Sequence, residues 1–185
     1  MTKEASRLLA QEMAQEAIEK LDTAISVDSN TWRPYELRAL CLLRLNSYER
    51  ALTDSDKAVA LSPGKTQKAH SLLIRASAKE ELKDYAAALS DCRALNVRHL
   101  SDAEKITCWG IMGRCYFNMG EFAQVVTIMS RALKLEPDNS WDRLRRSAAY
   151  RKLGKRREAL KDCEYVLSRD PENNRAKKEL EKLSS

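Results

Sequence analysis

The sequence predicts an all-α protein in which antiparallel helix pairs repeat along the chain. Segments around Ala51, Ala88, Val125 and Ala159 resemble one another and follow at spacings of 37, 37 and 34 residues. Apolar residues recur every three or four positions, which is the period of a helix and not of a strand. The 185 residues include only five glycines and four prolines, against roughly 13 and 9 expected from average usage. Few turns and long helices follow from this composition.

The repeat frame divides the chain into units. A proline closes three of the units (Pro63, Pro137 and Pro171), and Leu100 takes that place in the other. This frame predicts helix pairs over 32–65, 66–102, 103–138 and 139–171. Residues 1–31 fit the frame as a degenerate first unit, and 172–185 form an amphipathic capping helix that shields the last unit. The whole chain is then one domain of about eleven helices.

Each predicted pair has a small residue at the middle of its first helix, which lets the second helix approach closely. These small residues are Ala39, Ala76, Gly113 and Ser147. Gly120 and Gly154 lie where the first helix must reverse into the second, because glycine adopts the left-handed conformation of a helix end without strain. The expected amino-terminal caps are Ser101 or Asp102 for one helix and Asp138 or Asn139 for another.

Composition excludes two classes of protein. With 43% hydrophobic and 32% charged residues, the chain is neither intrinsically disordered nor membrane-spanning, and no apolar run approaches the ~18 residues of a span. Its first residues lack the apolar core of a signal peptide. Five scattered cysteines without metal-ligand spacing indicate reduced thiols. We therefore expect a cytoplasmic protein, with the nucleus as an alternative location.

The motif Trp109-x-x-Met112-Gly113-x-x-Tyr116 resembles the first helix of the tetratricopeptide repeat, and the closing Pro137 matches the end of that repeat. The likeness covers nearly the whole chain as about five units. It implies a right-handed superhelical solenoid, whose first helices line a concave groove that binds a partner peptide. The aromatic residues and glycines of the motif are then core residues rather than catalytic ones.

Three phrases, Leu52-Thr-Asp-Ser, Leu89-Ser-Asp-Cys and Leu160-Lys-Asp-Cys, are similar to repeats of eukaryotic cochaperones. In that group, lysine, asparagine and arginine on successive first helices hold the terminal carboxylate of a heat-shock chaperone. Here Leu37 stands in place of the amide, and His70 and Ile74 stand in place of the lysine and arginine. A second register, with Arg114 and Arg145, would be needed to rebuild such a clamp.

The groove residues expected from the phase of the first helices combine arginines with apolar side chains. This lining suits a peptide with hydrophobic anchors and acidic groups, because arginine binds a carboxylate through two parallel hydrogen bonds. The alternative is that each residue is solvated or packs on a neighbour. The expected groove residues are Arg33, Leu37, Leu40, Arg44, His70, Ile74, Ser77, Ile111, Arg114, Phe117, Asn118, Trp141, Arg145, Ala148 and Arg151.

The net charge of +6 is concentrated in one segment. The segment from Arg143 to Lys161 contains nine basic residues and one acidic residue, so this basic strip has a net charge of +8 and the rest of the chain a net charge of −2. The strip is either a solvated face or a functional site, which could bind phosphates or nucleic acid, an acidic partner or anionic lipid, or act as a nuclear import signal. Besides the groove residues Arg145 and Arg151, its cations are Arg143, Arg146, Lys152, Lys155, Arg156, Arg157 and Lys161.

Motifs of catalysis are missing from the sequence. The two histidines, His70 and His99, lie far apart in the repeat frame, and no Ser-His-Asp set or paired metal-ligand motif occurs. Pro63-Gly64-Lys65-Thr66 lacks the upstream glycine of a phosphate-binding loop, so we interpret it as a loop between repeats. We expect no enzyme activity, no cofactor and no metal.

The sequence thus predicts a protein-interaction adaptor that binds a partner peptide in its groove. A heat-shock chaperone or a client is a candidate partner, by family resemblance. Phosphate or nucleic acid binding by the basic strip is the alternative function.

Overall fold

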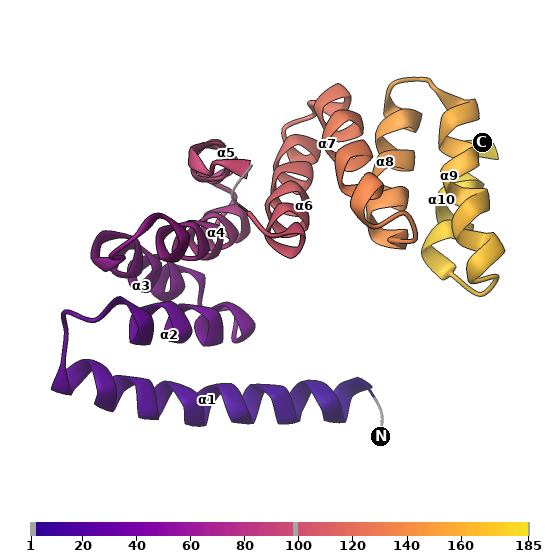
Figure 1. Cartoon of the computed structure of the whole chain (residues 1–185). Helices are drawn as coiled ribbons and strands as arrows, with labels where there is room; N and C mark the ends of the chain where they lie inside the picture. The colour runs from indigo at the N-terminus through magenta and orange to yellow at the C-terminus, as the bar shows by residue number, and fades with distance from the viewer. Residues whose placement is uncertain (1–2, 98–99, 185) are drawn as a thin grey trace. The chain divides into compact units, whose positions relative to one another are not determined.

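The computed structural model describes residues 3–97 and 100–184, with side chains from residue 13 onward, and these residues form ten α-helices and no strand. The chain divides into two compact units, 1–100 and 101–185 (Figure 1). Unit 1 holds α1 (Lys3–Val27), α2 (Trp32–Arg44), α3 (Tyr48–Leu61), α4 (Lys65–Glu81) and α5 (Tyr85–Ala94). Unit 2 holds α6 (Asp102–Asn118), α7 (Phe122–Leu135), α8 (Ser140–Lys152), α9 (Arg156–Arg169) and α10 (Asn174–Ser184).

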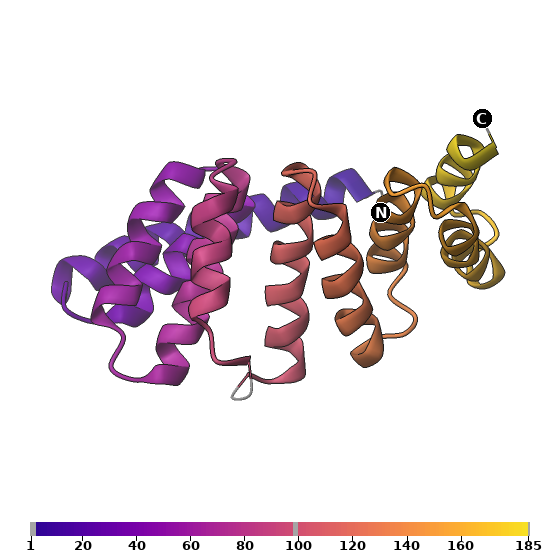
Figure 2. The same ribbon diagram turned by 90° about the horizontal axis from the view of Figure 1, so that it is seen from above.

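Within each unit, every helix packs against the next one along the chain (Figures 1 and 2). Three-residue turns join the members of each pair, and the middle residue of each turn has a positive φ. Gly120 and Gly154 take this position as predicted, at φ of 78° and 72°. Asn46 and Lys83 take it in unit 1, at φ of 57° and 65°. In all four turns, backbone N–H groups bond back to the last carbonyls of the first helix.

The predicted helix starts in unit 2 are confirmed. Ser101 forms a capping box with Glu104 at the start of α6, and the Asn139 side chain accepts a hydrogen bond from the Asp142 N–H at the start of α8. In unit 1, Asp84 caps α5 by accepting from the Ala87 N–H at 3.2 Å. These caps satisfy N–H groups that a helix leaves unbonded in its first turn.

Small residues bring the two helices of each pair together. Ala39, Ala76 and Ser147 are fully buried, and Gly113 is buried at the equivalent place in α6. The Ser147 hydroxyl lies 2.9 Å from the Ala159 carbonyl oxygen and 3.1 Å from the Cys163 thiol. Cys163 is fully buried, as expected for a small core residue.

Buried ion pairs also join the helices of a pair. Arg38 donates through two nitrogens to the carboxylate of Asp54, both at 2.7 Å. Arg75 makes the same fork with Asp91 one repeat later, at 2.6 and 2.8 Å. The aspartates of the phrases Leu-x-Asp-Ser and Leu-x-Asp-Cys are therefore partners of an arginine 16 residues upstream. A charge-assisted fork of this kind fixes the register of the two helices.

The first 31 residues do not form the helix pair implied by a count of eleven helices. The one long helix α1 occupies Lys3–Val27, so the described residues hold ten helices. Ile18 of α1 packs with Leu42, Ala51 and Ala78 in the core of unit 1. Since α2 already provides an apolar face for α1, no second amino-terminal helix is needed to bury it.

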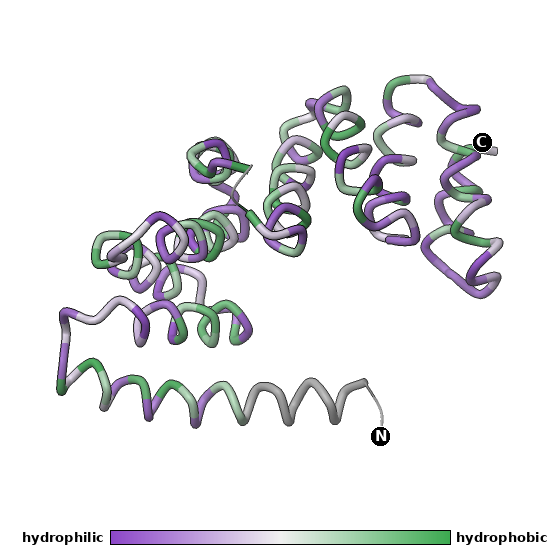
Figure 3. Tube along the Cα trace, viewed as in Figure 1, coloured by the Kyte–Doolittle hydropathy of each residue, from purple (hydrophilic) through white to green (hydrophobic). Residues whose placement is uncertain are grey.

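The last helix covers the apolar face of α9 and α8. Leu183 packs with Ala159 and Cys163, while Leu144 and Leu180 border this cluster. Hydrophilic residues make up much of the trace of α9 and α10 (Figure 3), so the apolar stripe of α10 is narrow. Among the described residues, no helix has the length and apolar composition needed to traverse a lipid bilayer.

Candidate functional site

Each unit has a hollow on the surface of its first helices. In unit 1 the hollow lies between α2 and α4 and has a volume of about 270 Å³. We call it groove 1. It is lined by Arg33, Glu36, Leu37, Leu40, His70, Leu73 and Ile74. Five of these seven residues were predicted from helix phase alone, and Glu36 and Leu73 were not.

Groove 1 is apolar with a buried carboxylate at one side. Leu37 and Leu40 are 37% and 41% exposed, so two leucines present apolar surface to solvent. Glu36 is only 2% exposed, and its Oε2 accepts a hydrogen bond from Arg33 at 2.6 Å. Its Oε1 has no hydrogen-bond partner in the part of the chain that the structure describes. Burial raises the pKa of Glu36, although Arg33 and His70 act in the opposite direction.

In unit 2 the hollow lies between α6, α8 and α10 and has a volume of about 410 Å³. We call it groove 2. Its lining residues are Arg114, Phe117, Asn118, Trp141, Leu144, Arg145, Ala148, Arg175, Lys178, Glu179 and Lys182. The volume falls within the range of about 300–1,000 Å³ typical of ligand sites.

Groove 2 combines aromatic surface with many cations. The Arg175 guanidinium lies 3.8 Å from the centre of the Trp141 ring, which is a cation–π contact, and Trp141 is 60% exposed. Glu179 is the only acid in the lining, and its Oε1 accepts a hydrogen bond from Arg151 at 2.7 Å. Arg145 lies 3.6 Å from the buried carboxylate of Asp142. Burial raises the pKa of Asp142, against the effect of Arg145.

Four residues predicted for the groove do not line either hollow. Ile111 is 1% exposed and belongs to the core, which corrects its assignment to a binding surface. The Ser77 hydroxyl donates to the Leu73 carbonyl oxygen at 3.1 Å. Arg44 is exposed at the last turn of α2. Arg151 is held by Glu179 behind the groove.

Sequence reasoning missed the contribution of α10. Its lining residues are Arg175, Lys178, Glu179 and Lys182, spaced as one face of a helix. The charge pattern was visible, but the segment was interpreted only through its apolar face. Leu144 was also missed, since it resembles an ordinary core position of α8.

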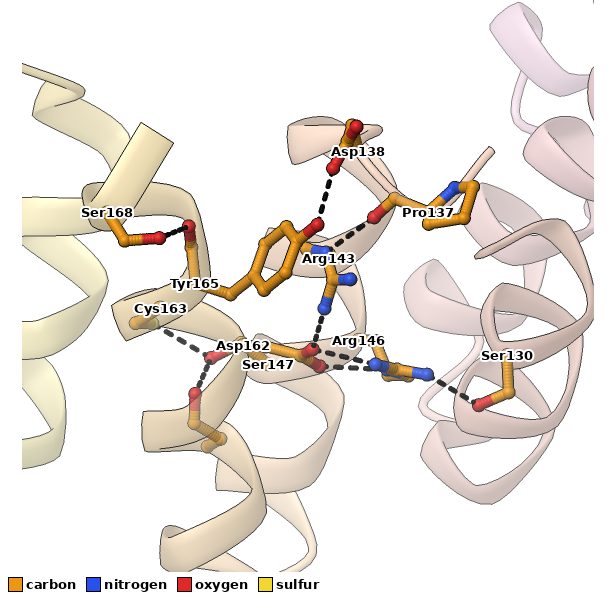
Figure 4. A network of polar contacts seen from close by, with 11 residues as sticks. Ser130, Pro137, Asp138, Arg143, Arg146, Ser147, Asp162, Cys163, Tyr165 and Ser168 are labelled. Atoms are coloured by element: carbon orange, nitrogen blue, oxygen red, sulfur yellow. Dashed lines mark hydrogen bonds and ion pairs between the residues drawn. The ribbon is translucent and has the colours of Figure 1, made fainter. Parts of the chain in front are cut away.

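The cations of the basic strip have different surroundings, and Figure 4 shows those that are held in ion pairs. Asp162 accepts hydrogen bonds from both Arg146, at 2.7 and 2.8 Å, and Arg143, at 3.2 Å. Arg143 also stacks 3.4 Å from the centre of the Tyr165 ring, whose hydroxyl donates to Asp138. These two arginines hold α8 to α9 and are not available as a phosphate site.

Four further cations of the strip lie at or beside the turn between α8 and α9, and Lys161 is exposed on α9. Lys152, Lys155, Arg156 and Arg157 are exposed, and among the described residues no ion pair within 4 Å is found for them. The structure therefore presents a short basic turn rather than a continuous basic helix pair.

The described residues contain no cluster of three or more side chains with metal-ligand chemistry. The cysteines have free thiols, and all but Cys41 are buried. Pro63 and Gly64 lie in the connection from α3 to α4, as predicted, whereas Lys65 and Thr66 belong to α4 and not to the loop. His99 lies outside the described residues.

Comparisons with known proteins agree with this architecture. Sequence models of the tetratricopeptide repeat match residues 2–66 and 106–139. A TPR repeat-containing thioredoxin of Arabidopsis thaliana, TTL4, is 28% identical over 123 residues. The match covers 66% of this chain, and the chain spans about a sixth of that relative, 16% of its length.

Solved structures share the fold at low sequence identity. The solved chain of MamA from Desulfovibrio magneticus RS-1, residue 41 to its end, superimposes with a TM-score of 0.74 at 17% identity, over 91% of this chain and 97% of that chain. YrrB, described as a TPR protein with an unusual peptide-binding site, superimposes with a TM-score of 0.69 at 18% identity, over 90% of this chain and 91% of the YrrB chain. The predicted class, an all-α solenoid of helix pairs, is thereby confirmed.

Proposed function

Because this chain belongs to the tetratricopeptide repeat family, we propose that it is a non-catalytic adaptor that binds a partner polypeptide on its first-helix surfaces. One observation carries the proposal: in both units the hollow lies on the first helices, where the phase of the sequence predicted a groove. The similar fold of YrrB, a protein with a peptide-binding site, supports a peptide as ligand. We expect it to act in the cytoplasm or nucleus.

Apolar side chains in the hollows would supply most of the affinity. Leu37 and Leu40 in groove 1 and Phe117 and Trp141 in groove 2 can cover apolar residues of a partner. Arginines beside them would orient the partner by pairing with its carboxylates, as in other helix or strand recognition surfaces. We expect such a surface to bind a partner without acting on it chemically.

A heat-shock chaperone tail is a candidate partner for groove 2 only. In groove 1, Leu37, His70 and Ile74 occupy the places where a carboxylate clamp needs an amide, a lysine and an arginine. An apolar surface of this kind favours a hydrophobic side chain over a terminal carboxylate. Groove 2 contains Arg114 and Arg145, whose charges are suited to a carboxylate.

The alternative function, phosphate or nucleic acid binding, would use the basic turn. It has less support, since Asp162 already binds two arginines of the strip. Four exposed cations without an interleaved aromatic ring make a weak platform for a nucleic acid strand.

The proposal is tested by selecting ligands from a random peptide library and measuring their affinities by calorimetry. Leu40→Glu alters groove 1 and Phe117→Ser alters groove 2, while Leu135→Ser removes an exposed leucine on the second helix α7 as a matched control. The affinity of the selected peptides should fall about tenfold or more for one of the groove variants and stay at the wild-type value for the control. Equal affinity for all four proteins would exclude the grooves as the binding site.

A further inference from the structure

The capping helix α10 has two faces with different roles. Ala176 and Leu183 are buried against the preceding pair, which is all that shielding the last unit requires. The face at Arg175, Lys178 and Lys182 instead lines groove 2. A helix that only capped the solenoid would have no reason to place three cations along a hollow on the first helices.

The lining of groove 2 has an excess of positive charge. Five cations line it, three from α10 together with Arg114 and Arg145, against the carboxylate of Glu179 in the lining and that of Asp142 beside Arg145. Glu179 is 7% exposed and is bound by Arg151, with Lys182 at 3.8 Å. Its charge is therefore largely compensated by cations of this chain. A hollow lined in this way attracts an acidic ligand.

The floor of groove 2 is apolar. Phe117, Leu144 and Ala148 form part of its lining, with Trp141 beside them. One face of the Trp141 ring is covered by Arg175, which leaves less of the ring for stacking a nucleotide base. An apolar side chain of a polypeptide can pack here while neighbouring carboxylates reach the cations.

Groove 1 has a different chemistry. Its one arginine, Arg33, donates to the buried carboxylate of Glu36 at 2.6 Å, and its remaining surface is mainly leucine and isoleucine. Groove 1 therefore lacks the arrangement of cations around aromatic side chains that groove 2 has.

From this contrast we infer that α10 forms one wall of a binding site in unit 2 for an acidic polypeptide segment that carries a large apolar side chain. The inference rests on the proposed function and names the chemistry of the partner for one groove. Carboxylates of the segment pair with Arg175, Lys178 and Lys182 on α10 and with Arg114 and Arg145 on the first helices. The apolar side chain occupies the floor beside Phe117 and Trp141.

The test compares two charge-matched variants in fluorescence anisotropy with a labelled peptide rich in glutamate that contains one phenylalanine. The double variant Arg175→Glu with Lys178→Glu reverses two charges on the α10 wall. The control Arg156→Glu with Arg157→Glu reverses two charges of the exposed basic turn and gives the same net charge. Circular dichroism establishes that both variants keep their helices.

We expect the α10 variant to lose about tenfold or more in affinity and the control less than about twofold at physiological salt. Replacing the peptide phenylalanine with serine should also weaken binding, and so should Trp141→Ala. Equal losses in both charge variants would overturn the inference, because binding would then follow net charge alone. Tighter binding of single-stranded DNA than of the peptide, unaffected by Trp141→Ala, would overturn it as well.

Failure of this inference can be told apart from failure of the proposed function by comparing acidic with neutral peptides. If the acidic peptide does not bind but neutral library peptides bind and respond to Leu40→Glu or Phe117→Ser, the inference fails and the adaptor function stands. If neither kind of peptide binds, both fail.

Discussion

The Arg175 guanidinium on the last helix lies 3.8 Å from the centre of the Trp141 ring on α8. This contact brings a side chain of the capping helix onto the surface of a first helix. Behind it, Arg151 of α8 donates to Glu179 of α10 at 2.7 Å. The two contacts fix the basic face of α10 beside groove 2, where we propose that an acidic segment binds.

Lys83 occupies a left-handed turn position that glycine fills in unit 2. Its φ is 65° and its side chain is exposed, so replacement by glycine removes backbone strain and little packing. We expect Lys83→Gly to raise the free energy of unfolding by about 0.5 kcal/mol. Unfolding in urea measures this difference in free energy between the variant and the natural protein. Asn46→Gly is the control and should gain less stability, since asparagine tolerates the left-handed conformation better than lysine does. A lower free energy of unfolding for Lys83→Gly would contradict the strained backbone at Lys83.

Gly113 and Met129 are complementary in size. A Cβ atom on residue 113 would overlap the Cε atom of Met129, which is fully buried. At the equivalent places of the earlier pair the chain has Ala76 and Cys92. Met129→Cys alone should cost about 2 kcal/mol through the cavity that it leaves.

Gly113→Ala should be more favourable for stability in the Met129→Cys protein than in the natural protein, because the added methyl group then fills the cavity left by the methionine side chain. A double-mutant cycle by urea unfolding should give a favourable coupling of about 1 kcal/mol. Additive effects would show that the two side chains do not compete for the same volume.

The ion pair of Arg38 and Asp54 should be replaceable by apolar residues. The places equivalent to these two residues in the α6–α7 pair are Met112 and Ile128. Asp54→Ala leaves a largely buried guanidinium without its main partner and should cost about 2–3 kcal/mol. Arg38→Met with Asp54→Ile should recover most of that loss, since Asp22, the other partner of Arg38, is half exposed and becomes solvated. A double variant as unstable as the sum of the single changes would contradict this.

Glu36 should make stability depend on pH in a defined direction. Burial raises its pKa in the folded protein above the ordinary value of about 4.3, so its contribution to stability is greatest below that pH and declines as the pH rises through the folded-state pKa. Glu36→Gln does not titrate. The stability of the variant relative to the natural protein should therefore increase as the pH rises from about 4 toward neutral.

Unfolding in urea at several pH values measures the difference in free energy of unfolding between the two proteins, in which the titration of groups that do not interact with Glu36 cancels. A difference that is constant with pH, or that shrinks as pH rises, would contradict the buried state of Glu36.

Local patterns predicted most of the fold. The small residues at 39, 76, 113 and 147 repeat in the sequence and are buried in the structure. Gly120, Ser101 and Asn139 mark helix ends through their own chemistry, and they were found for that reason. Lys83 was missed because a lysine in a left-handed turn carries no sign of its conformation in the sequence.

The candidate site was predicted less completely. Helix phase placed Leu37 and Ile111 at equivalent positions, yet the first is 37% exposed and the second 1%. Their difference depends on side chains from neighbouring elements, which the phase of one helix does not contain. The lining role of Arg175 was missed for the same reason, since only packing decides which hollow the polar face of α10 borders.

The most direct test of groove binding uses the indole N–H signals of the three tryptophans in nuclear magnetic resonance spectra. Trp141 lines groove 2, whereas Trp32 and Trp109 line neither hollow. Titration with the acidic, phenylalanine-containing peptide should shift the Trp141 signal to saturation, with the dissociation constant found by anisotropy, and leave the other two nearly unchanged. Binding without a shift at Trp141, or with equal shifts at all three, would contradict the account.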